Sequence, residues 1–219
     1  MSSYSGDDDP NRIIRREGPG LRVVALGDEV DAIAKRTGLA VSFGEKRQAC
    51  VLSPVGMAVT FGGGTAEAQQ ALTLGGTAGM AIASLTAVSL DDRGKAVGHQ
   101  LAFSSGTENE AHSQQLAIAN GARSVADGFL SIALGQEAMA IARAGGTIAI
   151  AYYDQHPGHW ETPHGCDPYW EDGDFFLSEL KVAKVGENGI RPNFIYKLDN
   201  RGNFVEVGPA AERRTCPAP

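Results

Sequence analysis

Large aromatic side chains, cysteines and long apolar runs are all scarce in this 219-residue chain. Phe, Trp and Tyr make up 7% of the residues, which argues against a core filled with large rings. The three cysteines, Cys50, Cys166 and Cys216, are widely spaced and odd in number, which argues against a disulfide framework and favours a reducing compartment. No apolar run approaches the ~18 residues of a membrane-spanning helix, and residues 1–20 lack the apolar segment of a signal peptide. We therefore expect a cytoplasmic protein with no membrane partner.

Positive charge is also scarce. The chain carries 19 Lys and Arg against 26 Asp and Glu, a net charge of −7, and its densest basic run, residues 12–16, lies next to three aspartates. This balance argues against a nucleic-acid partner, because such binding depends on neutralising phosphates. A solenoid that mimics DNA would need rows of acidic residues, and the repeating block described next offers only Asp127 and Glu137.

Small residues are abundant, and between Leu116 and Ala151 they recur every seven positions. Larger apolar residues such as Leu134, Ile141 and Ile148 lie between them. The three columns of small residues are Ala117, Ser124, Ser131, Ala138 and Gly145; Ala119, Ala126, Ala133, Ala140 and Thr147; and Gly121, Gly128, Gly135, Ala142 and Ala149.

A seven-residue repeat is compatible with a coiled coil or with a β-solenoid. In a coiled coil the glycine column would face the seam, where each interior glycine costs about 1 kcal/mol relative to alanine and removes the knob that the seam requires. As strands, each unit has about five alternating residues and a two-residue corner, and stacked small residues let backbones approach closely. We therefore predict an all-β solenoid with corners at Ala122-Arg123, Phe129-Leu130, Gln136-Glu137 and Arg143-Ala144.

A fourth column holds larger apolar residues: Ile118, Val125, Ile132 and Met139. If the small columns fill the inside of the roll, these side chains point outward and require a covering surface, because large apolar patches are rarely left in water. That arrangement predicts a homo-oligomer, most simply a trimer, with these four residues in the interface. If the large residues fill the inside, a monomer suffices.

The rest of the chain divides by composition. A short helix is expected from Asp28, at its N-cap, to Gly38, and the segment 65–71 is the best other local helix candidate. Alternating runs separated by turn residues predict three strands after residue 174. The predicted regions are a flexible leader (1–20), an N-terminal cap (21–48), the solenoid (49–151), an irregular loop rich in His, Trp and Pro (152–174), a C-terminal β cap (175–209) and a flexible tail (210–219).

The irregular loop contains the one cluster of metal-ligand residue types, His156, His159, His164 and Cys166. Zinc binds such sets tetrahedrally, so a zinc site is one hypothesis. The other is a proline-rich loop that covers the end of the solenoid with its aromatic side chains. Outside this cluster we expect no cofactor, and no residue pattern identifies a catalytic set.

The segment Gly121–Ala142 resembles the head repeats of trimeric autotransporter adhesins, and this resemblance implies a left-handed β-roll. The segment Lys184–Val207, KVGENGIRPNFIYKLDNRGNFVEV, resembles the ending of an uncharacterised phage and prophage family of Ala/Gly/Ser-rich repeat proteins, with Ile195 where that family usually has Trp. The second resemblance implies a solenoid with a β cap and a phage or mobile-element origin.

The combined expectation is a non-enzymatic, self-associating β-solenoid that presents a surface to a host or phage protein, in the cytoplasm of a bacterial host or in a virion. The alternative is a metal-binding module or a metal-dependent enzyme centred on the His/Cys cluster.

Overall fold

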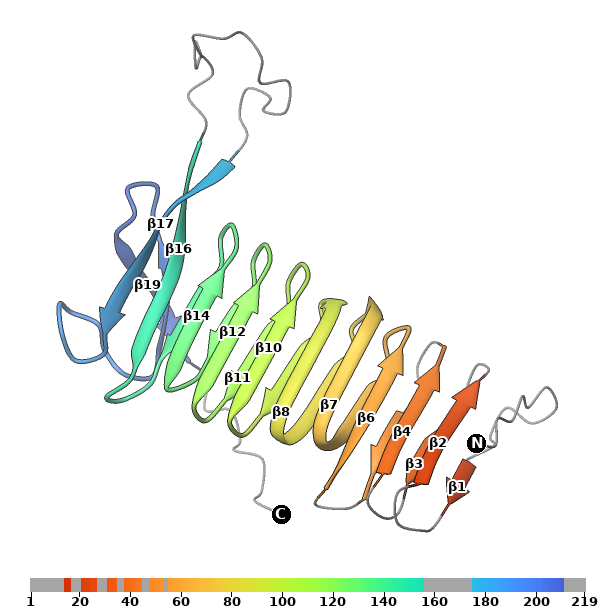
Figure 1. Cartoon of the computed structure of the whole chain (residues 1–219). Helices are drawn as coiled ribbons and strands as arrows, with labels where there is room; N and C mark the ends of the chain where they lie inside the picture. The colour runs from red at the N-terminus through yellow and green to blue at the C-terminus, as the bar shows by residue number, and fades with distance from the viewer. Residues whose placement is uncertain are drawn as a thin grey trace, which may run out of the picture.

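The computed structural model describes residues 14–16, 21–26, 31–34, 38–44, 48–52, 55–155 and 175–210. Every regular element in this part of the chain is a β-strand. Figure 1 shows the strands stacked coil upon coil along one axis, with a group of antiparallel strands at the C-terminal end. The predicted β-solenoid with a C-terminal β cap is therefore confirmed, and it has about eight turns.

Each coil contributes one strand to each of two layers, and neighbouring strands within a layer are parallel. Strands β7 (Thr65–Thr77) and β8 (Met80–Asp92) bend and contribute to both layers. The other strands of the first layer are β2 (Leu21–Leu26), β4 (Gly38–Phe43), β6 (Gly56–Phe61), β10 (Leu101–Ser105), β12 (Leu116–Asn120), β14 (Leu130–Leu134) and β16 (Thr147–Gln155). Those of the second layer are β1 (Ile14–Arg16), β3 (Ala32–Ala34), β5 (Gln48–Val51), β9 (Lys95–Gly98), β11 (Glu110–Ser113), β13 (Val125–Asp127) and β15 (Met139–Ala142).

The seven-residue unit of the sequence is half a coil. In the first layer Ile118 pairs with Ile132, two units further along the chain. The unit between them lies in the second layer, where Val125 pairs with Met139. Successive corners therefore lie on opposite edges of the solenoid, which explains why their composition alternates.

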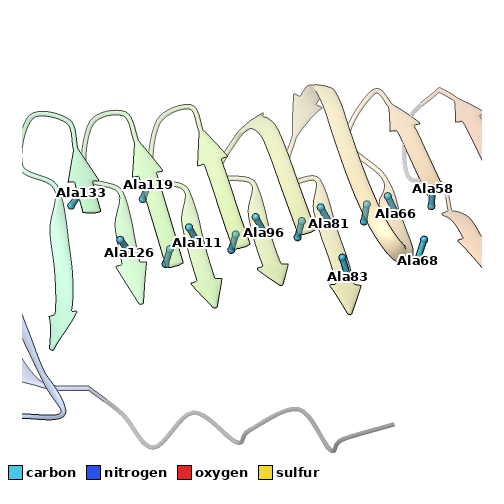
Figure 2. Packing of buried hydrophobic residues seen from close by; sticks show 14 of the residues in the cluster. Ala58, Ala66, Ala68, Ala81, Ala83, Ala96, Ala111, Ala119, Ala126 and Ala133 are labelled. Carbon is cyan, nitrogen blue, oxygen red and sulfur yellow. The ribbon is translucent and has the colours of Figure 1, made fainter. Parts of the chain in front are cut away.

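The interior of the solenoid is a narrow space lined by small side chains (Figure 2). From β3 to β15 of the second layer one alanine from each coil stacks directly on the next, and each of them is fully buried. Because the side chains of this column end at Cβ, the two backbones lie close together. The stacked residues are Ala32, Ala49, Ala66, Ala81, Ala96, Ala111, Ala126 and Ala140.

The first layer lines the same space with hydroxyl side chains as well as alanine. Thr73 donates a hydrogen bond to Ser89 (2.9 Å), and Ser104 donates one to the side-chain oxygen of Asn109 (2.6 Å). Serine and threonine fit here because a hydroxyl is about as small as a methyl group. The inward column is Ser42, Thr60, Thr73, Ser89 and Ser104, all fully buried.

Glycines stack where the backbones of successive coils approach most closely. A Cβ atom on Gly121 would lie 2.0 Å from the carbonyl oxygen of Gly106, and one on Gly135 would lie 1.9 Å from that of Gly121. Gly121 also has a φ of 132°, a conformation that side chains with a Cβ rarely adopt. Part of the glycine column therefore reflects coil stacking.

The antiparallel cap consists of three strands. They close the C-terminal end of the stack because β17 pairs with β16, while β18 pairs with both β15 and β19. All three were predicted from the sequence as strands. Their bounds are β17 (Phe175–Lys184), β18 (Phe194–Leu198) and β19 (Phe204–Pro209).

The last coil departs from the seven-residue register. Ile148 pairs with the inward Ser131, and Ile150 with the inward Ala133, so both isoleucines point inward and are fully buried. The coil that ends in β16 is longer than the coil before it, because Val125 pairs with Met139 but Leu130 pairs with Thr147. The extra residues lie in the corner before β16. Their number is odd, so positions of the seven-residue repeat that point inward in β14 point outward in β16, and the reverse. The predicted small columns therefore do not continue through residues 145–149. The wide isoleucines fit because the cap, rather than another narrow coil, covers this end.

Both predicted helices are wrong in the part of the chain that the structure describes. Residues 32–34 form β3, and residues 65–71 begin β7. Ala66 and Ala68 are buried inside the stack while Glu67 between them is exposed, which is the alternation of a strand. Stacking against neighbouring strands thus overrides the local helix propensity. In the region predicted as an N-terminal cap, residues 21–48, the described strands β2 and β4 pair in the same stack as the strands that follow.

The C-terminal motif GIRPNFIYKL…FVEV forms a compact network in the cap. The Arg191 guanidinium donates to both carboxylate oxygens of Glu206 and lies 4.0 Å from the centre of the Phe194 ring. The Tyr196 hydroxyl donates to Glu206 (3.3 Å) and accepts from the Arg191 amide (2.8 Å). Hydrogen bonds from Arg191 lower the pKa of the Glu206 carboxyl. The motif therefore joins β18 to β19 and to the turn before them.

Candidate functional site

The outer face of the first layer is an apolar surface that runs along the solenoid, and we call it the apolar face. Its central column takes one side chain from each strand, in register from β2 to β16, and every one is apolar. The column consists of Val24, Val41, Val59, Leu72, Val88, Phe103, Ile118, Ile132 and Ala149.

One flanking column lies on each side of the central column, and both are mostly apolar too. Leu26, Phe43, Met57 and Leu90 are each between 37% and 41% exposed, although large apolar side chains are normally buried. Phe43 and Phe61, on neighbouring coils, stack with ring centres 4.6 Å apart. Among the described side chains of these three columns, Arg22 alone carries a charge.

The cap strand β17 extends the apolar face by one strand. Val182 and Leu180 pair with the outward-facing Ala149 and Ala151, and a register shift in β17 returns Leu177 to the same face, opposite Tyr153. The exposed fractions of Leu177, Leu180 and Val182 are 56%, 45% and 62%. The most exposed aliphatic side chains of the face are therefore at its C-terminal end.

The structure separates the four residues predicted to form an oligomer interface. Ile118 and Ile132 lie side by side on the apolar face. Val125 and Met139 lie side by side on the outer face of the second layer. The small columns fill the inside, so all four side chains point outward, two on each outer face.

The second outer face is different, because a chain of charges crosses it. Lys95 contacts Glu110 (3.0 Å), and Glu110 contacts His112 Nε2 (2.9 Å). His112 Nδ1 is 3.2 Å from Asp127, which accepts a hydrogen bond from Arg143 (2.7 Å). The five side chains come from four successive coils, since Glu110 and His112 are both in β11, and their contacts link each coil to the next.

Within this chain of charges the carboxyl of Asp127 has a shifted pKa. Burial of its side chain raises its pKa, but hydrogen bonds with His112 and Arg143, together with their positive charges, outweigh burial and lower the pKa to about 2. A carboxyl whose pKa is lower in the folded state stabilises that state above its unfolded pKa of about 3.9. The contribution is lost as the pH falls through the folded pKa.

We expect Asp127→Asn to lower the free energy of unfolding at pH 7 by about 2 kcal/mol, since a pKa difference of one unit corresponds to about 1.4 kcal/mol. Between about pH 4 and pH 2 the native chain loses this contribution and the variant does not. Urea denaturation at several pH values measures both, and the two curves should converge near pH 2. A difference that stays constant from pH 7 to pH 2 would contradict the role of Asp127.

The predicted metal ligands His156, His159, His164 and Cys166 lie outside the described residues. Among the described residues no group of three or more His, Cys, Asp or Glu side chains could hold a metal ion. Cys50 is half-buried on the second outer face, and burial, followed by the negative charge of Glu67, raises the pKa of its thiol.

No helix in the described residues is long and apolar enough to cross a membrane.

The continuous apolar face was missed by sequence reasoning outside residues 116–151. The signal was present in runs such as LRVVAL, LAVSF and GMAVTF, in which Val, Leu, Met or Phe alternates with small residues or valine. Coil length varies in the N-terminal half, so these runs do not align at one period, and only their shared alternation identifies them. Comparisons of the chain with family models, with curated proteins and with solved structures found no match.

Proposed function

We propose that this chain is a non-enzymatic structural solenoid that self-associates through its apolar face. The observation that carries the proposal is the unbroken central column, apolar in every strand from β2 to β16. A monomer would leave most of this column partly exposed to water, because seven of its nine side chains are half-buried and only Val59 and Ala149 are buried.

The size of the apolar face supports a stable contact. Nine strands about 4.8 Å apart, each with three outward side chains, give a surface roughly 40 Å by 14 Å, or about 550 Å². This area is at the upper end of the roughly 300–600 Å² of the largest apolar patch on a typical monomer, and such patches are often functional. Two copies would bury about 1,100 Å² in total, above the ~1,000 Å² expected of a biological interface.

A second copy of the same chain fits this face better than a small ligand or a charged partner. The face is the outer surface of a sheet, and such a surface offers a small molecule little enclosure. It also carries almost no charge with which to select an acidic or basic partner. Packing two such faces about 10 Å apart reproduces the interior of a β-sandwich.

In this proposal the second outer face, with its charged chain from Lys95 to Arg143, remains in solvent and is available to a different protein. The C-terminal resemblance to phage and prophage repeat proteins supports a structural or host-interaction role for such an assembly. The trimer expected from the sequence remains one form that the assembly could take.

The proposal predicts that Ile118→Lys with Ile132→Lys abolishes self-association. Two lysines in the centre of the apolar face would have to be buried without partners, at a cost of several kcal/mol. Size-exclusion chromatography with light scattering should give the mass of one chain, 22.9 kDa, for this variant and a multiple of it for the native chain.

The matched control is Val125→Lys with Met139→Lys. These residues make the equivalent pair on the second outer face, and their partial exposure matches that of Ile118 and Ile132. The control should keep the native assembly. Equal effects of the two double variants, with both still folded by circular dichroism, would contradict an interface on the apolar face.

A further inference from the structure

We propose that two copies pair through their apolar faces with their solenoid axes antiparallel, related by a two-fold axis that runs along the strand direction between β10 and β12. This proposal rests on the self-association proposed above and adds its orientation. The added observation is the order of charges along one edge of the apolar face.

That edge is formed by the corners where the strands of the first layer end, visible as a row of loops after β10, β12 and β14 in Figure 1. The corner residue with positive φ occupies the same position in five successive coils, where Ala78 is followed by four charged residues. Its backbone amide donates to the next coil, as from Glu108 to the carbonyl of Ala122 (2.9 Å), which holds the row in register. The four residues are Arg93, Glu108, Arg123 and Glu137, all exposed and alternating in sign.

The alternating row is complementary to itself when it is reversed. A two-fold axis along the strands keeps this edge on the same side of both copies and reverses the order of the coils. Glu108 then faces Arg123 of the second copy, and Arg93 faces Glu137. Glu108 and Arg123 already form an ion pair within one chain (2.8 Å), so pairing adds a second set and gives a square of four alternating charges. Asp92 adds one acid to the row, and its carboxylate accepts from the Thr107 amide.

The same two-fold axis also places small outward side chains of one copy opposite large ones of the other. The axis places β16 of one copy opposite β7 of the other, so the small Ala149 and Ala151 face the larger Leu72 and Leu74. It also places β17 opposite β6. The highly exposed Leu180 and Val182 then lie over a strand that presents Met57, Val59 and Phe61. Only β2 and β4 extend beyond the overlap.

If the solenoid axes of the two copies were parallel, the charged row of one copy would not meet the charged row of the other. Rotation about an axis parallel to the solenoid, whether two-fold or three-fold, brings this edge toward the opposite edge of the next copy. The opposite edge carries Gln100, Gln114, Gln115 and Phe129, which offer no alternating charge. Side-by-side pairing of the row in the same direction would oppose like charges, which is unfavourable.

Two single charge reversals, Glu108→Arg and Arg123→Glu, test the orientation in the full-length protein. In a dimer of either variant alone, like charges face each other at both contacts between positions 108 and 123. We therefore expect the dissociation constant of each variant to rise about tenfold or more. In a dimer with one copy of each variant, both contacts again join opposite charges. We expect an equimolar mixture to recover native affinity within about threefold.

Sedimentation velocity with one variant fluorescently labelled measures the mixed species directly. Glu187→Arg is the matched control, because it reverses an exposed charge that is paired within the chain to Lys184 (3.1 Å) in the cap, away from the row. It should associate like the native chain. Native association of both single variants, or no recovery in the mixture, overturns the antiparallel pairing and leaves the proposed self-association intact. A native chain that is monomeric at all concentrations overturns both.

Discussion

Replacing Ala111 by leucine should unfold much of the solenoid or lower its free energy of unfolding by about 3 kcal/mol or more. Ala111 is fully buried and pairs with Ala96 in one neighbouring coil and Ala126 in the other. The isobutyl side chain of leucine has no space between the two layers, because the opposing backbone is only a small side chain away. The two layers would have to move apart to remove this steric clash. Because each strand is hydrogen-bonded to the strands of the neighbouring coils, the separation would extend across several coils.

The matched control is Ala144→Leu, at an exposed corner position. It adds the same group outside the stack and should change the free energy of unfolding by no more than about 0.5 kcal/mol. Thermal and urea denaturation of both variants measures the difference. If Ala111→Leu is as stable as the control, the interior is wider than the structure shows and the packing argument fails.

Replacing Gly121 by alanine should be similarly damaging and should lower the free energy of unfolding by about 4 kcal/mol. A Cβ atom would lie 2.0 Å from the Gly106 carbonyl oxygen, a backbone atom that cannot rotate away. The φ of 132° adds backbone strain of about 1–3 kcal/mol, and overpacking adds a similar amount. Urea denaturation of the purified variant measures the combined cost.

Two other glycines separate these causes. Gly75 has a positive φ but open space around its Cβ position, so Gly75→Ala should cost about 1 kcal/mol, from backbone strain alone. Gly208 has open space and no positive φ, so Gly208→Ala should be neutral within about 0.5 kcal/mol. Equal costs at Gly121 and Gly75 would show that close coil contact contributes nothing.

Alternation and the seven-residue repeat were sufficient to predict the strands and corners of residues 116–142. They were not sufficient to place the interior, because a strand such as LAIAN is compatible with either face inside. The structure resolves this through stacking. Alanine is inward in every coil of the second layer from β3 to β15, where large residues would force the layers apart.

Coil length limits what periodicity can predict. The register pairs Met57 with Gln70 but Val41 with Val59, so neighbouring coils in the N-terminal half differ by several residues. A search for one fixed repeat length therefore does not detect these coils. The helix propensity of the segment TAEAQQA alone then suggests a helix there. The same effect hides the exchange of faces in the last coil, where one longer corner turns Ile148 inward.

The candidate site was only partly predictable. The sequence identified Ile118, Val125, Ile132 and Met139 as one column, since they share one seven-residue phase. Because a coil contains two units, that phase alternates between opposite faces of the solenoid. Assigning the pairs to faces requires the strand register, and so does recognition of the charged row at the corners.

The mass of the native chain in solution tests the central claim, burial of the apolar face against another copy, most directly. Light scattering should be recorded during size exclusion over a series of protein concentrations. We predict a species of twice the chain mass of 22.9 kDa at high concentration, dissociating on dilution. A species of 22.9 kDa at every concentration would contradict the account.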